Sequence, residues 1–506
     1  MKFSLTFIGI FICWSSFAAV STAELEAIFK NLTTAIGDYR QEIPQLEIRS
    51  SKGQVATYSR LNNTIYIEKA AIAVCEQFGE QTRDAIAFLL AHELTHFYQK
   101  HDWQEAGFAS TFLSSKMTFE QQRADEVEAD TYGAFMSYLA GYQTIDIIPI
   151  LLEKLYTDYE LTDENLSSYP SLANRQSVAN QVCEQVKTLI RIYEAGNYFF
   201  ALDQLEEAFY CFQYVAKYVR CKEVMNNLGA TALAAASLMS DREQLPFAYP
   251  IALDPQLPLR APSGLTKKEL LIVAEKQLNS ATQYDPTYYR AFINLACVFE
   301  LQEKPERLKV LIEQLDNLPL STIEQGQVLI LKGIAAARKA EQNTAKQFFK
   351  KARSMAKDPF IQLLGKHNEQ VLNQKTPIYR SLSMSMIDDQ INDYNLILNN
   401  PTPQESILLH HDGVNDIRLE WLQMPTAIFI QMGKGKVLMT ADKNLTTRKG
   451  IRIGDATENL LKIYDSNESP LIAKGKQWLI HSASGLIFEL AKDGRTVQKW
   501  GIYQVD

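Results

Sequence analysis

Two histidines spaced four residues apart are the clearest candidates for chemistry in this chain of 506 residues. His92 and His96 belong to the motif His-Glu-Leu-Thr-His, and the apolar periodicity around it predicts a helix from Asp84 to Tyr98. On a helix this spacing puts both imidazoles on one face, with their Cβ atoms about 5–6 Å apart, so that both can bind one metal ion. Glu93 follows the first histidine and can accept a proton from a water on that metal. Zinc lowers the pKa of such a water to about 7, which permits attack on a carbonyl at neutral pH.

A catalytic zinc also needs a third protein ligand and one open coordination position. Glu126 and Asp130 supply two carboxylates four residues apart, on one face of a second predicted helix. Either one can bind the metal while the other accepts the free ring N–H of a ligand histidine and so fixes its tautomer. Ala129 and Gly133 are small, which allows this helix to approach the first one closely. We therefore predict one Zn²⁺ per chain; an exposed His/Glu pattern on a structural helix is the alternative.

The pairing of HExxH with a later ExxxD resembles the M48 family of zinc metallopeptidases, over residues 55–160. The resemblance implies three metal ligands, a general base and a partner that orients a ligand histidine: His92, His96 and Glu126, then Glu93, then Asp130. It also implies an edge strand that pairs with the substrate backbone, for which Thr64–Glu68 is the matching candidate. Tyr132 and His101 are the candidates for stabilising the oxyanion.

The first residues of the chain have the pattern of an export signal. Met1 and Lys2 precede an apolar run up to Trp14, and small residues follow as far as Ala23. A basic start, a short apolar core and small residues predict a signal peptide over residues 1–23. The apolar run is shorter than the roughly 20 residues that span a bilayer. We expect an exported protein, periplasmic or secreted, with no transmembrane segment in the mature chain; a buried N-terminal helix is the alternative.

The mature chain is expected to be multidomain, beginning with a protease domain and a repeat array. Residues 24–187 are mainly helical in pattern, with one strand-like run at 64–68, and the motifs predict a zincin-like protease domain. Residues 188–375 repeat with a period near 34, which is typical of tetratricopeptide-like repeats and predicts an α-solenoid. Small, small and aromatic residues recur at the same spacing in two units: Gly196, Ala208 and Phe212, then Gly333, Ala345 and Phe349. A Pro-rich insertion over 241–264 interrupts one unit. A generic helical bundle is the alternative.

The C-terminal part is predicted to be a small β-rich domain. Residues 376–404 contain an Asn- and Pro-rich stretch and are expected to be a linker. Residues 405–506 contain strand-like runs joined by Gly-containing turns, which predict hairpins. We assign this domain no chemistry, and we interpret His410 and His411 within it as ordinary surface residues.

Composition and charge limit the classes of function. The hydrophobic fraction of 46% and the charged fraction of 22% are globular and exclude a mostly disordered chain. With 51 basic and 59 acidic residues the net charge is −8, which argues against nucleic-acid binding. The cysteines of the mature chain show no CxxC spacing, and Cys211 with Cys221 is the pair considered for a disulfide. Buried thiols on helices are the alternative.

A signal peptide, an M48-like domain and tetratricopeptide repeats together resemble the periplasmic M48 proteases that monitor β-barrel assembly in the outer membrane. The leading hypothesis is an exported zinc endopeptidase whose repeats bind protein or peptide substrates, or an envelope protein partner. A second hypothesis is a non-catalytic scaffold or chaperone with a latent or plugged protease domain. A third is a zinc peptidase acting on peptidoglycan or small peptides, which the repeats make weaker.

Overall fold

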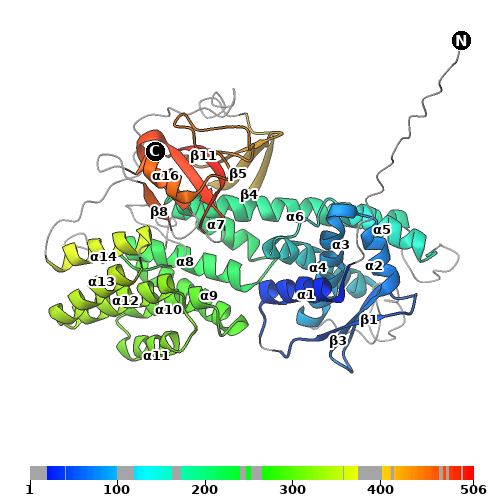
Figure 1. Ribbon diagram of the computed structural model, residues 1–506, viewed down its shortest axis with the longest axis horizontal. Helices are drawn as coiled ribbons and strands as arrows, with labels where there is room; N and C mark the ends of the chain where they lie inside the picture. Colours follow the sequence, from blue (N-terminus) through cyan, green and yellow to red (C-terminus); the bar gives the residue numbers. More distant parts are fainter. Residues whose placement is uncertain are drawn as a thin grey trace, which may run out of the picture. The chain divides into compact units, whose positions relative to one another are not determined.

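The computed structural model describes residues 20–39, 41–99, 119–161, 172–239, 247–251, 265–356, 358–373, 402–411, 415–465, 471–474, 478–491 and 494–505. The protein is mostly helical, with an antiparallel sheet at its C-terminal end (Figure 1). Two compact units divide the chain: Met1–Ile36 with Gln41–Lys187, and Gly37–Arg40 with Thr188–Asp506. Among the described helices, none combines the length and the apolar character that crossing a bilayer requires.

Two predicted segments fall largely outside the described residues. The first 19 positions of the predicted signal peptide lie there, as does most of the linker at 376–404. Helix α1 (Thr22–Ile36) begins just before the expected start of the mature chain near Glu24. Ser21 caps this helix, since its hydroxyl accepts from the Glu24 amide at 3.3 Å while Glu24 Oε2 accepts from the Ser21 amide at 3.2 Å.

The first unit is built around helix α3 (Thr82–Gln99), which carries the HExxH motif. Every residue of α3 from Ala85 to Tyr98 is buried, as expected for a helix that is apolar on most of its circumference. The ends of α3 lie within two residues of the predicted helix from Asp84 to Tyr98. The other elements of the unit are α2 (Lys69–Glu76), the 3-10 turn η1 (Gly79–Gln81), α4 (Phe119–Ala140), α5 (Ile148–Asp158) and the start of α6 (Leu172–Ala201).

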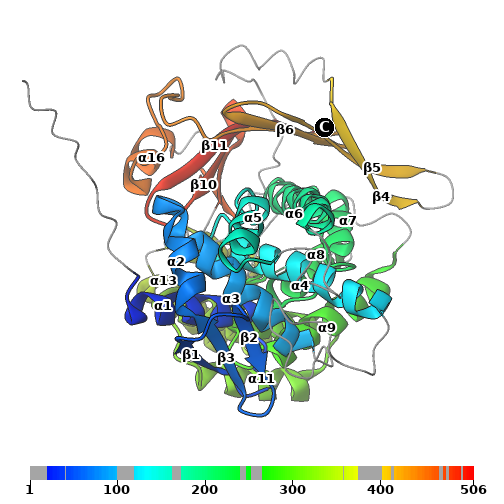
Figure 2. The same ribbon diagram turned by 90° about the vertical axis from the view of Figure 1, so that its right-hand side faces the viewer.

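A three-stranded sheet accompanies these helices, where the sequence predicted a single strand. Its order is β1 (Gln45–Arg49), β3 (Thr64–Glu68) and β2 (Ala56–Ser59), as Figure 2 shows. Strand β3 pairs in parallel with β1 and antiparallel with β2, so both of its edges are occupied. The assignment of Thr64–Glu68 as a substrate-binding edge strand is therefore wrong. All five of its residues are buried, which is typical of a central strand.

One buried carboxylate holds the loop that leads into β2. Glu68 accepts hydrogen bonds from the backbone amides of Gly53, Gln54 and Val55 at 3.0–3.2 Å. The hydroxyl of Tyr159 donates to the same carboxylate at 2.8 Å. Burial alone would raise the pKa of Glu68, but these hydrogen bonds outweigh it and lower the pKa. The ionised carboxylate thus anchors the loop that positions strand β2.

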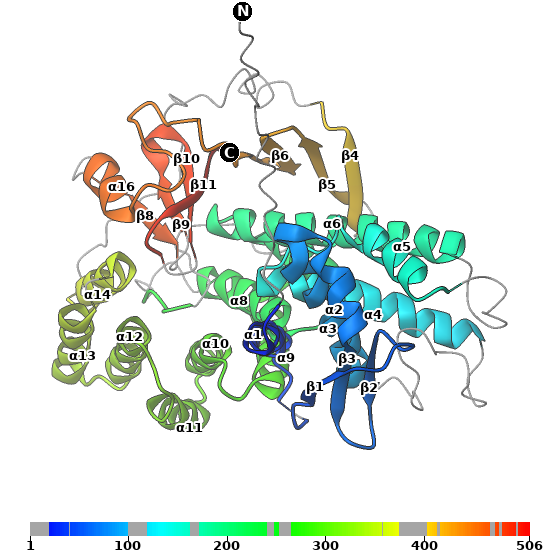
Figure 3. The ribbon, with the colours of Figure 1, turned by 45° about the vertical axis from the view of Figure 1, so that its right-hand side comes forward.

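The second unit contains successive helical hairpins. They follow the C-terminal part of α6, and Figure 3 shows α8 to α14 in succession. The helices are α7 (Leu205–Val215), α8 (Lys222–Leu238), α9 (Lys267–Tyr284), α10 (Tyr289–Leu301), α11 (Pro305–Asp316), α12 (Thr322–Arg338), α13 (Gln342–Met355) and α14 (Pro359–Leu372). Helices α9, α11 and α13 each pack against the even-numbered helix before them, and α8, α10, α12 and α14 also pack against their neighbours in that series.

Glycines let the two helices of a hairpin come together. A Cβ on Gly196 would lie 2.9 Å from the ring of Phe212, and one on Gly333 would lie 2.4 Å from the ring of Phe349. A Cβ on Gly229 would likewise lie 2.7 Å from Leu278, across the insertion between α8 and α9. The interrupted unit is thus closed by the same small-against-large contact as its neighbours, which explains the recurrence of these residues.

The C-terminal sheet has eight antiparallel strands in the order β4, β5, β6, β7, β11, β10, β9 and β8. Its strands are β4 (Glu405–His411), β5 (Asp416–Gln423), β6 (Ala427–Met432), β7 (Gly435–Thr440), β8 (Ile472–Lys474), β9 (Trp478–His481), β10 (Leu486–Leu490) and β11 (Val497–Gln504), with helix α16 (Thr457–Tyr464) between β7 and β8. The predicted hairpins are β6–β7 and β10–β11. In the first of them Gly433 has φ +56°, a left-handed conformation that favours glycine in a tight turn.

The sheet packs on the first hairpin of its own unit. Lys499 of β11 forms an ion pair of 3.2 Å with Glu194 of α6, and the ring of Trp478 meets that of Tyr198 edge-on at 5.4 Å. His410 stacks on Tyr210 of α7 at 4.9 Å. The adjacent His411 is exposed and bonds to Asp416. Neither histidine belongs to the metal-binding cluster found among the described residues.

The cysteines in the described part of the chain are all buried and unpaired. They are Cys75, Cys183, Cys211, Cys221 and Cys297. The disulfide considered between Cys211 and Cys221 is not formed. Burial raises the pKa of both thiols well above the usual value, so they remain protonated and pack as small apolar side chains.

The seam between α12 and α13 provides a test of this packing. Replacing Gly333 with Ala should lower the free energy of unfolding by about 1–2 kcal/mol, because the new methyl group collides with the fully buried Phe349. Gly326→Ala in the same helix is the matched control. This substitution brings the same gain in helix propensity, but the new Cβ would lie 3.2 Å from its nearest neighbour, a side-chain carbon of Ile361. Urea denaturation measures both. Equal effects of the two substitutions would contradict a tight seam at Gly333.

Candidate metal centre

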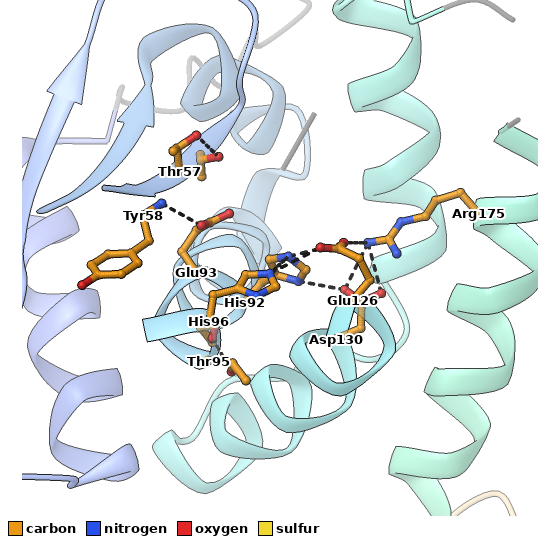
Figure 4. A network of polar contacts seen from close by, with 11 residues as sticks. Thr57, Tyr58, His92, Glu93, Thr95, His96, Glu126, Asp130 and Arg175 are labelled. Carbon is orange, nitrogen blue, oxygen red and sulfur yellow. Dashed lines mark hydrogen bonds and ion pairs between the residues drawn. The ribbon is translucent and has the colours of Figure 1, made fainter. Parts of the chain in front are cut away.

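Helices α3 and α4 bring together the side chains that the two motifs single out (Figure 4). The Nε2 atoms of His92 and His96 lie 3.0 Å apart, because the four-residue spacing places the rings on one face of α3. On its other side, His92 Nδ1 lies 2.9 Å from Asp130 Oδ1 of α4. If the ring proton of His92 is on Nδ1, it is donated to this carboxylate. Nε2 then carries a lone pair, which is directed at His96 and Glu126.

Glu126 of α4 completes a cluster of three groups. Its Oε1 lies 3.4 Å from His96 Nε2, and its Oε2 lies 3.8 Å from His92 Nε2. Burial alone would raise the pKa of Glu126, but the neighbouring His92, His96 and the guanidinium of Arg175 outweigh it and lower the pKa to about 2. The carboxylate is therefore ionised at any physiological pH, as a metal ligand must be.

The geometry of the cluster fits a tetrahedral cation such as zinc. His92, His96 and Glu126 each offer one ligand atom, and these atoms lie within 4.8 Å of one another. Two atoms that each bind a tetrahedral zinc at 2.0–2.1 Å are about 3.3 Å apart, which lies within the observed range of 3.0–3.8 Å. Two imidazoles and one carboxylate are also the donor set of a catalytic site that leaves one position open.

Glu93 lies beside the cluster and has one oxygen available. Its Oε2 accepts from the backbone amide of Tyr58 in strand β2 at 2.9 Å. Its Oε1 is buried, and no described residue donates a hydrogen bond to it. Burial raises the pKa of Glu93 to about 7, and the opposing effect of His92 only partly offsets this. A carboxylate with such a pKa can both accept and return a proton near neutral pH.

Sequence reasoning missed Arg175, which lies at the start of α6. Its Nη2 atom is 3.1 Å from Asp130 Oδ2 and 3.4 Å from Glu126 Oε2, with only 10% of the side chain exposed. The guanidinium thus compensates two buried carboxylates at once. It follows Asp130 by 45 positions, so no local spacing could have indicated it.

The predicted candidates for the oxyanion role are not both placed. Tyr132 is buried on α4, in the same helix as Glu126 and Asp130. His101 lies outside the described residues. The cluster of five residues predicted from the motifs is brought together, whereas the group that would stabilise an oxyanion is not identified.

No protein-family model matches the chain, and no curated protein is significantly similar to it in sequence. Function is therefore inferred from the motifs and from the geometry of the site.

Metal content tests the cluster directly. We expect the purified chain to hold about one zinc ion, and His96→Ala to lose it, because two remaining protein ligands do not retain zinc. His411→Ala removes an exposed histidine and should keep the metal. Elemental analysis after dialysis against zinc measures all three proteins. Equal zinc in the His96 variant would contradict the assignment.

The role of Arg175 can be separated from that of the metal. Arg175→Met leaves two buried carboxylates without their cation, which should lower the free energy of unfolding of the metal-free protein by about 3 kcal/mol. With zinc added the loss should be smaller, since the metal supplies positive charge. Arg83→Met breaks an exposed pair with Glu24 and should have a much smaller effect on the free energy of unfolding, because solvent screens such a pair. Urea denaturation with and without chelator decides, and similar small losses in both variants would refute charge compensation by Arg175.

Proposed function

We propose that this chain is an exported zinc-dependent endopeptidase, similar to the M48 family, that hydrolyses peptide bonds in protein substrates. The observation that carries the proposal is the convergence of His92, His96 and Glu126 beside Glu93, whose buried Oε1 has no donor among the described residues. The N-terminal sequence supports export to the periplasm or beyond. A zincin-like fold for the first unit and tetratricopeptide-like repeats in the second belong to the same proposal.

Each side chain of the cluster has a distinct task in this mechanism. When bound, zinc would supply Lewis-acid activation of water and of the scissile carbonyl. Asp130 holds the Nδ1 proton of His92, which keeps Nε2 directed into the site. Glu93 Oε1 accepts a proton from the attacking water and returns it to the amine nitrogen of the leaving peptide. The hydrogen bond from the Tyr58 amide keeps Glu93 in place for both transfers.

Strand β2 is the better candidate for holding the substrate backbone. Among the described strands it pairs only with β3, so no described strand occupies its second edge, where the Tyr58 amide donates to Glu93. An extended substrate that adds to this edge by β-pairing would run past the general base. The repeats of the second unit would then bind other parts of the substrate or a partner protein, which is the usual role of curved helical arrays.

Replacing Glu93 with Gln tests catalysis apart from metal binding. We expect cleavage of unfolded, fluorescently quenched casein to fall by a factor of about 10²–10⁴, because the amide cannot accept the proton. Zinc content should be unchanged, since Glu93 is not a ligand. Glu80→Gln, an exposed glutamate before α3, is the matched control and should retain activity.

The result also decides between an enzyme and a scaffold. Cleavage by the purified Glu93 variant at the rate of the unaltered protein would overturn the mechanism. A zinc-loaded protein that cleaves neither casein nor any substrate retained by the Glu93 variant would favour a binding scaffold or chaperone with a latent protease domain.

A further inference from the structure

A short segment of the insertion between α8 and α9 returns to the helical array. Residues Phe247–Ile251 have no regular secondary structure, and Ala248, Tyr249 and Ile251 are buried. Asn368 of α14, which follows Ala248 by 120 positions, forms hydrogen bonds with the backbone of this segment. Its Oδ1 accepts from the Ala248 amide at 2.7 Å, and its Nδ2 donates to the Ala248 carbonyl at 2.9 Å. One side-chain amide thus makes both hydrogen bonds that a neighbouring β-strand would make.

Helices α10 and α12 contact the side chains of the same segment. The Tyr249 hydroxyl donates to Glu300 near the end of α10. The other oxygen of Glu300 accepts from Arg338 Nε of α12 at 3.1 Å. That guanidinium lies 5.4 Å from the ring centre of Phe247, within the range of a cation–π contact. Three consecutive even-numbered helices therefore each supply a polar group to one uncharged, aromatic stretch of chain.

These polar groups are arranged to recognise a ligand backbone. Asn368 is fully buried and bonds only with backbone atoms of Ala248 among the described residues. A buried side-chain amide without partners is costly, so Asn368 needs a backbone segment in this place, whether from the chain itself or from a ligand. Because the contact is to N–H and C=O, it would accept many sequences, whereas Glu300 selects a hydroxyl-bearing aromatic residue one position later.

We propose that α10, α12 and α14 form a binding site for an extended, uncharged peptide segment with aromatic residues, and that Phe247–Ile251 is the chain's own occupant of it. This deepens the proposed function, since it rests on the repeats binding protein segments and names the class of segment. A tethered occupant has an effective concentration in the millimolar range, so an external peptide must compete with it. The insertion thereby sets a threshold for substrate binding.

The probe for this site is a fluorescein-labelled peptide with the sequence of residues 246–252, Pro-Phe-Ala-Tyr-Pro-Ile-Ala. Fluorescence anisotropy measures its binding to the full chain. Tyr249→Ala weakens the internal occupant, so the peptide should bind this variant at least tenfold more tightly than the unaltered protein. Adding Asn368→Leu should weaken that binding at least tenfold, because both backbone hydrogen bonds are lost. Asn373→Leu changes an exposed asparagine at the end of α14 and should have no effect.

A measurement on the unaltered protein covers the case in which Tyr249→Ala does not fold. The Ala248 amide should exchange its hydrogen at least tenfold faster than amides in the middle of α10 and α14, and faster still with excess free peptide. Exchange at the same rate as these helices, unaffected by peptide, would show that the segment is a fixed part of the core and would overturn the proposal. A folded Tyr249 variant that binds peptide no better than the unaltered protein would do the same.

These readouts are independent of the metal centre. Zinc content and the loss of cleavage in Glu93→Gln do not depend on what occupies the binding site formed by α10, α12 and α14. Failure of peptide binding would therefore leave the protease proposal standing. If the peptide binds but the protein neither holds zinc nor cleaves protein, the proposal of a peptide-binding site is supported and the proposal of an endopeptidase is refuted.

Discussion

The candidate metal centre depends on how closely α4 approaches α3. A Cβ on Gly133 would lie 3.0 Å from the backbone nitrogen of His92 and 3.1 Å from the carbonyl carbon of Ala91, so even a methyl group would force the helices apart. At this separation Asp130 reaches the outer nitrogen of His92 and Glu126 reaches the inner ones. A pair of helices held further apart would keep both motifs and lose the cluster.

The sequence predicted what depends on spacing within one helix. His92 and His96 lie four residues apart in α3, and Glu126 and Asp130 lie four residues apart in α4, so the 3.6-residue period places each pair on one face, with Glu93 directly after the first histidine. Arg175 and the Tyr58 amide could not be foreseen, because their contacts join elements far apart in sequence. The same limit explains the error over β3. A short apolar run indicates a strand, but only the pairing with the polar β1 and the short β2 shows that it is central.

In the repeats, the contacts that close each hairpin were visible in the sequence and those of the insertion were not. The spacing of Gly196 and Phe212 recurs at Gly333 and Phe349 because each pair fills the same seam. Pro-rich composition correctly marked the insertion as a break in the pattern. Composition does not predict where such a segment packs. The hydrogen bonds between Asn368 and Ala248 join positions 120 residues apart, and they use backbone atoms of Ala248, which carry no sequence signal.

Buried polar atoms in folded proteins are almost always paired, and two clusters of this chain meet that requirement differently. Asn368 and Glu300 find partners in the backbone and side chains of the segment between α8 and α9. At the helix pair, His92, His96 and Glu126 each offer one ligand atom, and these atoms lie within 4.8 Å of one another. Three such atoms can share one cation, which none of the three side chains supplies, and the proposal of a metal rests on this geometry.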